Sequence, residues 1–358
     1  MKKSGRIRGY AIAVTVAIVL VAAVAIWMNL RERPEEGKRV NYTNPVFEPV
    51  FADPSVIRGD DGYVYAYGTE DDWGDGKGSR IVPVLRSKDM TRWDYVGEAF
   101  EQKPDWMDGG VWAPDVAQFQ GKYYMYYTMS LWGDQNPGIG LAIADSPQGP
   151  FADQGKILSS DEMEAYSIDP MFIVDEGQPY LFFGGITSGI FGVPLSADGR
   201  SVAGEKFQIS GTGYEAPYII KRGKYYYFFG SAGACCEGAD STYRVGVARA
   251  ESLHGPYLNQ AGEDIRYSEG STILGGYFPA DAEHPFVGPG HNSVIADDEG
   301  TDWIVYHAID INYPKFGHGV TRRPLMIDKL VWKDGWPSVE GAVPSNGEMP
   351  GPIFHGKR

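Results

Sequence analysis

The chain of 358 residues contains only two cysteines, Cys235 and Cys236, and they are adjacent. A bond between them cannot join distant segments, so a framework held by disulfides is excluded. Their Cα atoms lie about 3.8 Å apart across a trans peptide, below the usual disulfide span of about 4.4–6.8 Å. A vicinal disulfide and a pair of free thiols both stay compatible with the sequence.

Positive charge is also scarce. Lys and Arg number 32 against 47 Asp and Glu, which gives a net charge of −15. Residues 1–30 hold four basic residues and no acidic one, so the remainder carries −19 (−15 − 4). An acidic body argues against nucleic acid or anionic lipid as partners. It suits a neutral substrate such as a polysaccharide, although acidity that only keeps the protein soluble is equally compatible.

Beyond residue 30, no long segment has the apolar periodicity of an amphipathic helix. Aromatic residues are abundant instead, at 13%, together with 47 Gly and 24 Pro. Short runs of Tyr, Phe and Val separated by turn residues are typical of strands and hairpins. The sequence therefore predicts an all-β protein with enough apolar residues for a large core.

One unit recurs five times: a short motif, an apolar stretch, a Gly turn and an aromatic strand. The turn glycines are Gly62, Gly121, Gly177, Gly223 and Gly300, at intervals of 59, 56, 46 and 77 residues. A repeat of this length, with an insertion before the last copy, is typical of a β-propeller. We therefore expect a five-bladed β-propeller, whose blades stack around a channel and expose only short sheet edges.

The N-terminus predicts export. A basic start is followed by 22 uncharged residues, 9–30, enough for a membrane-spanning helix of about 20 residues. The basic start favours an N-terminus in the cytoplasm, and a cleaved signal peptide is the alternative. Either way, we expect the body to be extracytoplasmic, either membrane-anchored or secreted.

The expected domain boundaries follow from these features. Residues 1–33 are the predicted anchor or signal segment and residues 34–42 a polar linker. Residues 43–340 are the predicted propeller and catalytic domain, and residues 341–358 a C-terminal tail.

Three of the five motifs carry an acidic residue at a matched position, immediately before or near a proline: Asp53, Asp169 and Glu215. If the copies converge around the channel at matched positions, the three carboxyl groups share one site at its mouth. Clustered carboxyl groups cut glycosidic bonds, one activating water and another protonating the departing oxygen. A third charge nearby helps to separate their pKa values. A single Asp-Pro is more often only a turn, so the prediction depends on the repeat.

Candidate substrate-binding residues lie close to these acids in the repeat. Trp73, Trp112 and Tyr214 offer flat rings to sugar C–H faces, and packing between blades is the alternative for each. Asp115 follows Trp112 in the second motif. Arg323, in an Arg-Arg pair before an apolar strand, could hold the carboxylates ionised, unless the pair is only solvated.

His291 holds the fifth copy's version of the mouth position and is the candidate metal ligand. No second His or Cys stands at ligand spacing, so water would have to supply the other ligands. A hydrogen-bonded structural histidine is the alternative.

At these residues the chain resembles glycoside hydrolase family 43, over roughly residues 44–339. The motifs that carry the resemblance are Phe51-Ala52-Asp53-Pro54-Ser55-Val56, Trp112-Ala113-Pro114-Asp115-Val116, Ser167-Ile168-Asp169-Pro170, Tyr214-Glu215-Ala216-Pro217 and Gly288-Pro289-Gly290-His291-Asn292-Ser293. The resemblance implies an inverting mechanism with Asp53 as general base, Glu215 as general acid and Asp169 as the group that tunes and orients the acid. It also implies that Arg323 contacts the acid or the sugar.

Three further segments, at residues 235–245, 302–307 and 329–337, are similar to the arabinanase branch of this family. That similarity implies endo-hydrolysis of α-1,5-L-arabinofuranosyl linkages in arabinan or arabino-oligosaccharides, and a calcium ion, mostly water-coordinated, near His291. An exo-acting α-L-arabinofuranosidase or β-xylosidase is the alternative, with a non-catalytic carbohydrate-binding propeller as a third. An open groove lined by Trp73 and Trp112 would favour endo cleavage. A monomer is expected.

Overall fold

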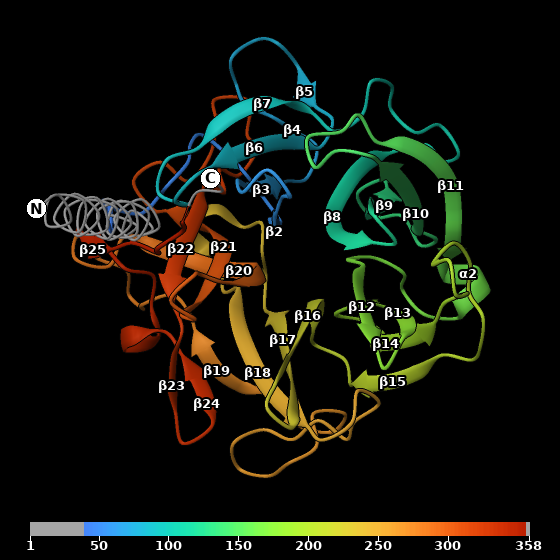
Figure 1. Cartoon of the computed structure of the whole chain (residues 1–358). Helices are drawn as coiled ribbons and strands as arrows, with labels where there is room; N and C mark the ends of the chain where they lie inside the picture. The colour runs from blue at the N-terminus through green and yellow to red at the C-terminus, as the bar shows by residue number, and fades with distance from the viewer. Residues whose placement is uncertain (1–38, 356–358) are drawn as a thin grey trace, which may run out of the picture.

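The computed structural model describes residues 39–355, and these form a ring of five antiparallel sheets around one axis (Figure 1). Each sheet is a blade. The blades are β2 (Ser55–Arg58), β3 (Val64–Tyr67), β6 (Pro83–Ser87) and β7 (Asp94–Glu98); β8 (Gly110–Phe119), β9 (Lys122–Ser130), β10 (Gly138–Ala144) and β11 (Ala152–Ser159); β12 (Met171–Asp175), β13 (Gln178–Gly185), β14 (Gly189–Pro194) and β15 (Phe207–Ser210); β16 (Glu215–Arg222), β17 (Tyr225–Ala232), β18 (Arg244–Ala250) and β19 (Ser271–Leu274); and β20 (Phe286–Ala296), β21 (Asp302–Asp310) and β22 (Leu325–Lys329).

The predicted five-bladed propeller is confirmed. In each blade the strands pair in chain order, and each innermost strand (β2, β8, β12, β16, β20) contacts those of both neighbouring blades. We call the end of the axis where these strands begin the mouth. The five predicted turn glycines lie at the opposite end of each first hairpin and have φ between 60° and 88°, a region that glycine enters without steric cost.

The N-terminal segment closes the ring. Val46 donates its amide to the carbonyl of Leu325, and Leu325 donates its amide to the carbonyl of Phe47, at 2.9 and 3.0 Å. The side-chain amide of Asn44 donates to the carbonyl of Ile327 and accepts from the amide of the same residue. The segment thus adds an outer edge to the three-stranded fifth blade, and a closed ring leaves no long unpaired sheet edge.

Both expected ends of the propeller domain need correction. In the expected linker, β1 (Asn41–Tyr42) pairs with β25 (Met349–Pro350) of the expected tail. Tyr42 is buried and donates its hydroxyl to Asp328, and the amide of Ile353 donates to Asp297. Both segments belong to the propeller because apolar burial and hydrogen bonds hold them there. The predicted segment 1–33 lies outside the described residues.

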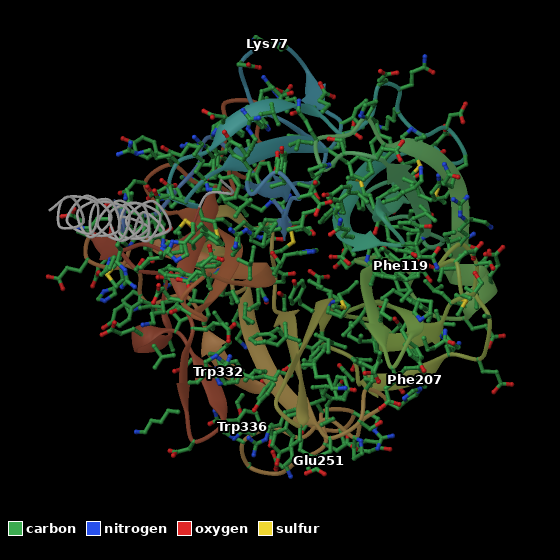
Figure 2. The ribbon with its side chains drawn as sticks, in the orientation of Figure 1. Lys77, Phe119, Phe207, Glu251, Trp332 and Trp336 are labelled. Carbon is green, nitrogen blue, oxygen red and sulfur yellow. A yellow bond between two sulfur atoms is a disulfide. The ribbon has the colours of Figure 1, made fainter. Side chains whose placement is uncertain are left out.

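Five apolar clusters hold the blades together, one for each interface of the ring. Aromatic residues are prominent in them: the ring of Phe119, labelled in Figure 2, lies 5.2 Å from that of Phe172 between the second and third blades. Two small hairpins are additional: β4 (Asp71–Asp72) with β5 (Ser79–Arg80), and β23 (Val331–Lys333) with β24 (Trp336–Ser338).

Helix is confined to single turns within residues 39–355: α2 (Ser160–Met163), η1 (Gly238–Asp240) and η2 (Glu340–Ala342). None of the helices in this part of the chain has the length and apolar content needed to cross a bilayer.

Candidate active site

At the mouth, each innermost strand begins with the same backbone device. In every blade one non-glycine residue lies in the left-handed region, and in β8, β16 and β20 the strand register shifts beside it. These residues are Asp53, Ala113, Asp169, Ala216 and His291, with φ of 55°, 45°, 53°, 52° and 47°. Such backbone costs of order 1–3 kcal/mol per residue and gathers at functional sites. The sequence pattern did not predict this backbone feature.

The amide of each left-handed residue is held by a side chain of the preceding blade. Ala113 donates to Thr69, Asp169 to Thr128 and His291 to Ser231, at 2.8, 3.0 and 2.8 Å. The other two acceptors are titratable: Asp169 Oδ2 accepts from Ala216 at 3.0 Å, and His307 Nδ1 accepts from Asp53 at 3.1 Å. The joints that fix the ring therefore also fix the candidate catalytic groups.

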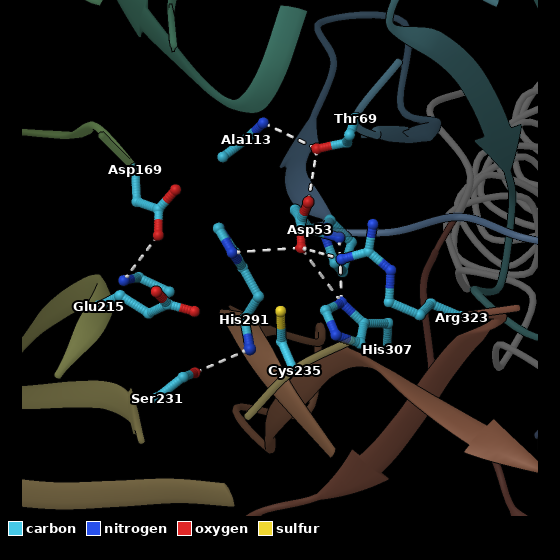
Figure 3. Close-up of polar contacts among 12 residues, drawn as sticks. Asp53, Thr69, Ala113, Asp169, Glu215, Ser231, Cys235, His291, His307 and Arg323 are labelled. Carbon is cyan, nitrogen blue, oxygen red and sulfur yellow. Dashed lines mark hydrogen bonds and ion pairs between the residues drawn. The ribbon is translucent and has the colours of Figure 1, made fainter. Parts of the chain in front are cut away.

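The three predicted acids converge at the mouth (Figure 3). Asp169 and Glu215 lie together on one side, and Asp53 lies across from them. Their positions in the repeat are not all matched, however. Asp53 and Asp169 are the left-handed residues of their blades, whereas in the fourth blade that place belongs to Ala216. Glu215 therefore stands one residue earlier, where the second blade has Trp112.

Asp53 is held as a carboxylate. It is 9% exposed, and its oxygens lie 2.6 Å from Thr69 Oγ1 and 3.2 Å from Arg323 Nη1. Burial acts to raise the pKa of Asp53, but the Arg323 guanidinium, the two nearby histidines and the Thr69 hydrogen bond together outweigh it and keep that pKa well below its usual range. The Nδ1 atoms of His291 and His307 lie 3.3 and 3.4 Å from Asp53 Oδ1.

Both histidines are expected to be neutral at pH 7, because burial lowers the pKa of each. Arg323 is therefore the positive charge that sets the state of Asp53. The sequence prediction for Arg323 is confirmed in that it pairs with a mouth carboxylate. The partner is Asp53, and the guanidinium also reaches Asp71 at 3.9 Å. Burial raises the pKa of Asp71 to about 6; sequence reasoning missed this residue.

Glu215 and Asp169 retain a proton at higher pH. Burial raises the pKa of Glu215 to about 7, opposed by the Tyr243 hydroxyl, which donates to Glu215 Oε1 at 2.8 Å. Burial also raises the pKa of Asp169, and the neighbouring Glu215 raises it further. Near neutral pH the site thus offers an ionised carboxylate on one side and a protonated carboxyl group on the other. Such a split in pKa values separates a base from an acid.

A buried aromatic pair connects the two sides. Tyr243 is 1% exposed, and its ring stacks on that of His307 with centroids 5.9 Å apart and planes at 10°. The hydrogen-bond partner of Glu215 therefore packs against the hydrogen-bond partner of Asp53. Sequence reasoning did not single out Tyr243, although it lies in the 235–245 segment that resembles arabinanases.

The predicted sugar contacts of Trp73 and Tyr214 are wrong, because both rings are buried by packing. Trp73 is 9% exposed and packs against Phe47 and Tyr95, at 5.4 and 5.0 Å, with the Arg80 guanidinium 4.1 Å from its ring. Tyr214 is 4% exposed, and its hydroxyl accepts the amide of Gly270 at 2.6 Å. Both rings serve packing, the alternative that the sequence left open.

Asp115 is a structural joint rather than a sugar contact. One of its oxygens accepts the Phe172 amide at 2.7 Å, and the other accepts the Ser55 hydroxyl at 3.3 Å. It therefore joins the first three blades, and burial raises its pKa to about 6. Trp112 is half-buried beside the mouth, so its role in substrate binding stays a prediction. Trp132 lies on the β9–β10 loop and is 83% exposed.

His291, the predicted metal ligand, has few other potential metal-binding side chains near it. Within residues 39–355, no three His, Cys, Asp or Glu side chains are grouped to hold a metal ion. Calcium takes six to eight oxygen ligands, so protein groups alone do not complete such a site. Both polar side-chain atoms of the neighbouring Asn292, and Nε2 of His307, are buried without a protein partner. These orphaned groups are compatible with ordered water or a hydrated ion.

The loop beside the site carries the adjacent cysteines. Cys235 and Cys236 are joined by a disulfide, and Cys235 is drawn among the residues of the mouth in Figure 3. The loop is tied to the fifth blade because Thr321 Oγ1 donates to the carbonyl of Cys236 at 2.8 Å.

An ionised carboxylate facing a protonated one across a propeller mouth is the arrangement of a glycosidase. The model of a known family, Glycosyl hydrolases family 43, matches residues 42–337. The chain belongs to that family, which confirms the resemblance found in the sequence.

The similar proteins include both modes of cleavage. An extracellular exo-α-(1→5)-L-arabinofuranosidase of Cellvibrio japonicus is 32% identical over 72% of this chain and 80% of its own length. An extracellular endo-α-(1→5)-L-arabinanase of Bacillus subtilis is 30% identical over 80% of this chain and 86% of its own. A solved structure of Cellvibrio cellulosa α-L-arabinanase with arabinohexaose has a TM-score of 0.71 at 30% identity, covering 82% of this chain and 96% of that one.

Proposed function

We propose that the protein is an endo-arabinanase that hydrolyses α-1,5-L-arabinofuranosyl linkages of arabinan with inversion. The observation that carries the proposal is the opposed pair of carboxyl groups, Asp53 ionised by Arg323 and Glu215 protonated through burial. The two relatives, one exo-acting and one endo-acting, are both named for activity on α-(1→5)-L-arabinosyl linkages, which supports the substrate class.

In the proposed mechanism, Asp53 takes a proton from water as that water attacks the anomeric carbon. Glu215 gives its proton to the departing glycosidic oxygen on the other face of the ring. The charge of Arg323 and the hydrogen bond from Thr69 keep Asp53 ionised before the reaction. Asp169 holds the amide next to Glu215 and so orients the acid. A positioned acid and base contribute typically 10²–10⁴-fold each.

The test is hydrolysis of linear arabinan by residues 34–358. Glu215→Gln and Asp53→Asn each should reduce kcat by at least about 10²-fold, with Glu101→Gln, at an exposed site, as the matched control. NMR of the first product should show the β-anomer, because single displacement inverts the α-linkage. Full activity of Glu215→Gln, or an initial α-anomer, would contradict the assignment.

An exo-acting arabinofuranosidase is the second candidate, and the 32% identical relative favours it. The two activities differ in the first products from a long chain. Endo cleavage gives a ladder of oligosaccharides, and exo cleavage gives one short product from the start. Xylan as substrate tests the β-xylosidase alternative in the same assay.

We also propose that a hydrated calcium ion binds beside His291, with the orphaned polar groups of Asn292 and His307 as support. When bound, the ion would supply positive charge near Asp53. Calorimetric titration of the chelator-treated protein with calcium should show one site, weakened in His291→Ala. Absence of binding heat would refute it.

For localisation, we propose that the body acts outside the cytoplasmic membrane, since two relatives are named extracellular enzymes. Anchoring through residues 9–30 is the finer proposal. Fractionation of cells that express the full chain tests it: an anchored protein stays with the membrane, and a cleaved one is released. The expected monomer is tested by light scattering.

A further inference from the structure

Exposed apolar side chains gather at the mouth. Residues 39–355 leave twelve large apolar side chains exposed, and seven of them lie on loops at the mouth end. Leu131, Trp132 and Ile186 belong to the second and third blades, and the other four belong to the fifth. A gathering of exposed apolar groups on one face marks a binding surface.

The exposed apolar side chains of the fifth blade lie on two loops. We call Tyr277, Phe278 and Tyr313, which are 44%, 57% and 64% exposed, the blade 5 rim. Their loops leave the same end of β20 and β21, because Phe286 pairs with Asp310. Ile311 donates its amide to the carbonyl of Pro285 at 3.0 Å, so the two loops lie side by side.

Each ring of the rim has a neighbouring residue beside it. Phe278 lies against Gly276, where a Cβ atom would come within 3.1 Å of the ring. Tyr277 stacks on His284 at 4.3 Å. The Arg322 guanidinium lies 5.9 Å from the centroid of the Tyr313 ring, and it donates to the Tyr313 carbonyl at 3.4 Å and to Glu48 at 2.8 Å. Supported rings lose little entropy on binding, which suits recognition of a flexible chain.

The rim is continuous with the site. The loop that carries Tyr313 ends at Arg323, which pairs with Asp53. The rim lies farther out than the reacting sugar, because Phe286 is five residues beyond His291 on β20, about 16 Å along a strand. In Figure 1 the fifth blade lies across the axis from the second and third blades. A polymer that crosses the mouth would contact exposed apolar groups on both sides.

We propose that the blade 5 rim is a distal subsite that binds the arabinan chain beyond the scissile bond, by stacking of furanose C–H faces on its rings. The two loops carry acidic residues, Asp281 and Glu283, and basic ones, Lys315 and Arg322, so the rim has no strong charge of one sign and suits a neutral saccharide. This proposal rests on the proposed function, and it predicts that affinity grows with chain length.

The experiment compares Tyr313→Ala, Phe278→Ala and their double variant with the unchanged protein. The matched control is Tyr267→Ala, at a tyrosine that is 86% exposed on the segment between the two outer strands of the fourth blade. Values of kcat/KM are measured for linear arabinan and for arabino-oligosaccharides of increasing length. We expect the double variant to lose about tenfold on the polymer and longest oligosaccharides, the order expected for one lost aromatic contact surface. Activity on the shortest cleaved oligosaccharide should not change.

Each outcome decides between the two proposals. An equal kcat/KM for the double variant and the unchanged protein at all lengths overturns the distal subsite and leaves the proposed function intact. An equal loss on short and long substrates also overturns it, because the effect is then not distal. If the unchanged protein cleaves none of these substrates, the proposed function fails instead.

Discussion

The hydrogen bond from Tyr243 to Glu215 makes a measurable prediction about pH. The Tyr243 hydroxyl donates to Oε1 at 2.8 Å, and such a donor stabilises the carboxylate over the carboxylic acid. Tyr243→Phe removes the donor but keeps the ring that stacks on His307. The pKa of Glu215, which lies at about 7, should therefore rise.

The size of the effect follows from the strength of the bond. A hydrogen bond to a charged group contributes about 1.5–3 kcal/mol, and one pKa unit corresponds to about 1.36 kcal/mol. Glu215 is only partly buried, so water replaces part of the lost bond. We expect the alkaline limb of the kcat/KM profile to move up by about one pH unit. The acid must be protonated to work, so activity above pH 7 should be retained longer in the variant.

The assay is the pH dependence of kcat/KM on linear arabinan between pH 4 and 10, with melting temperatures at each pH. Tyr214→Phe is the matched control, because it removes an equally buried hydroxyl that accepts a backbone amide and touches no carboxylate. It should lower stability without moving the limb. An unchanged limb in Tyr243→Phe, with the fold intact, would refute the role given to Tyr243 and weaken that of Glu215.

Other predictions follow from the same contacts. Arg323→Gln should raise the pKa of Asp53, because it removes the charge that keeps that pKa low; the acidic limb of the kcat/KM profile should move to higher pH, and an unmoved limb would contradict the pairing. Asp115→Ala should cost about 1–3 kcal/mol of unfolding free energy, since it orphans the buried amide of Phe172, and denaturant melts should show this with KM unchanged. Trp73→Ala should cost about 3–5 kcal/mol and leave the product pattern unchanged, whereas a changed pattern would restore its predicted sugar contact.

Stability should also depend on pH through Asp115. Its folded pKa, at about 6, is above the ordinary Asp value, so the folded state binds this proton more tightly than the unfolded state. The contribution to stability is fully present below about pH 4 and is lost as pH rises through about 6. In Asp115→Asn this part of the pH dependence should disappear from urea melts between pH 4 and 7. If this pH dependence of stability persists in Asp115→Asn, other carboxyl groups cause it.

The sequence by itself determined the number of blades, the turns and the three acids. A fivefold repeat of strand-forming residues with Gly at each first hairpin has few ways to close other than a propeller, and Asp53, Asp169 and Glu215 were found from their motifs. His291 and Arg323 were likewise placed near these acids, and both lie beside Asp53.

Only the tertiary structure decided which aromatic rings face solvent and which groups set the pKa values. Trp73 and Trp132 look alike in the chain, but one is 9% and the other 83% exposed, because exposure depends on what the neighbouring blades place on top of a loop. Tyr243 and His307 gained their roles only when the fourth and fifth blades met the first. Local patterns fix strands and turns, whereas burial and charge at a site are sums over groups that are distant in the chain.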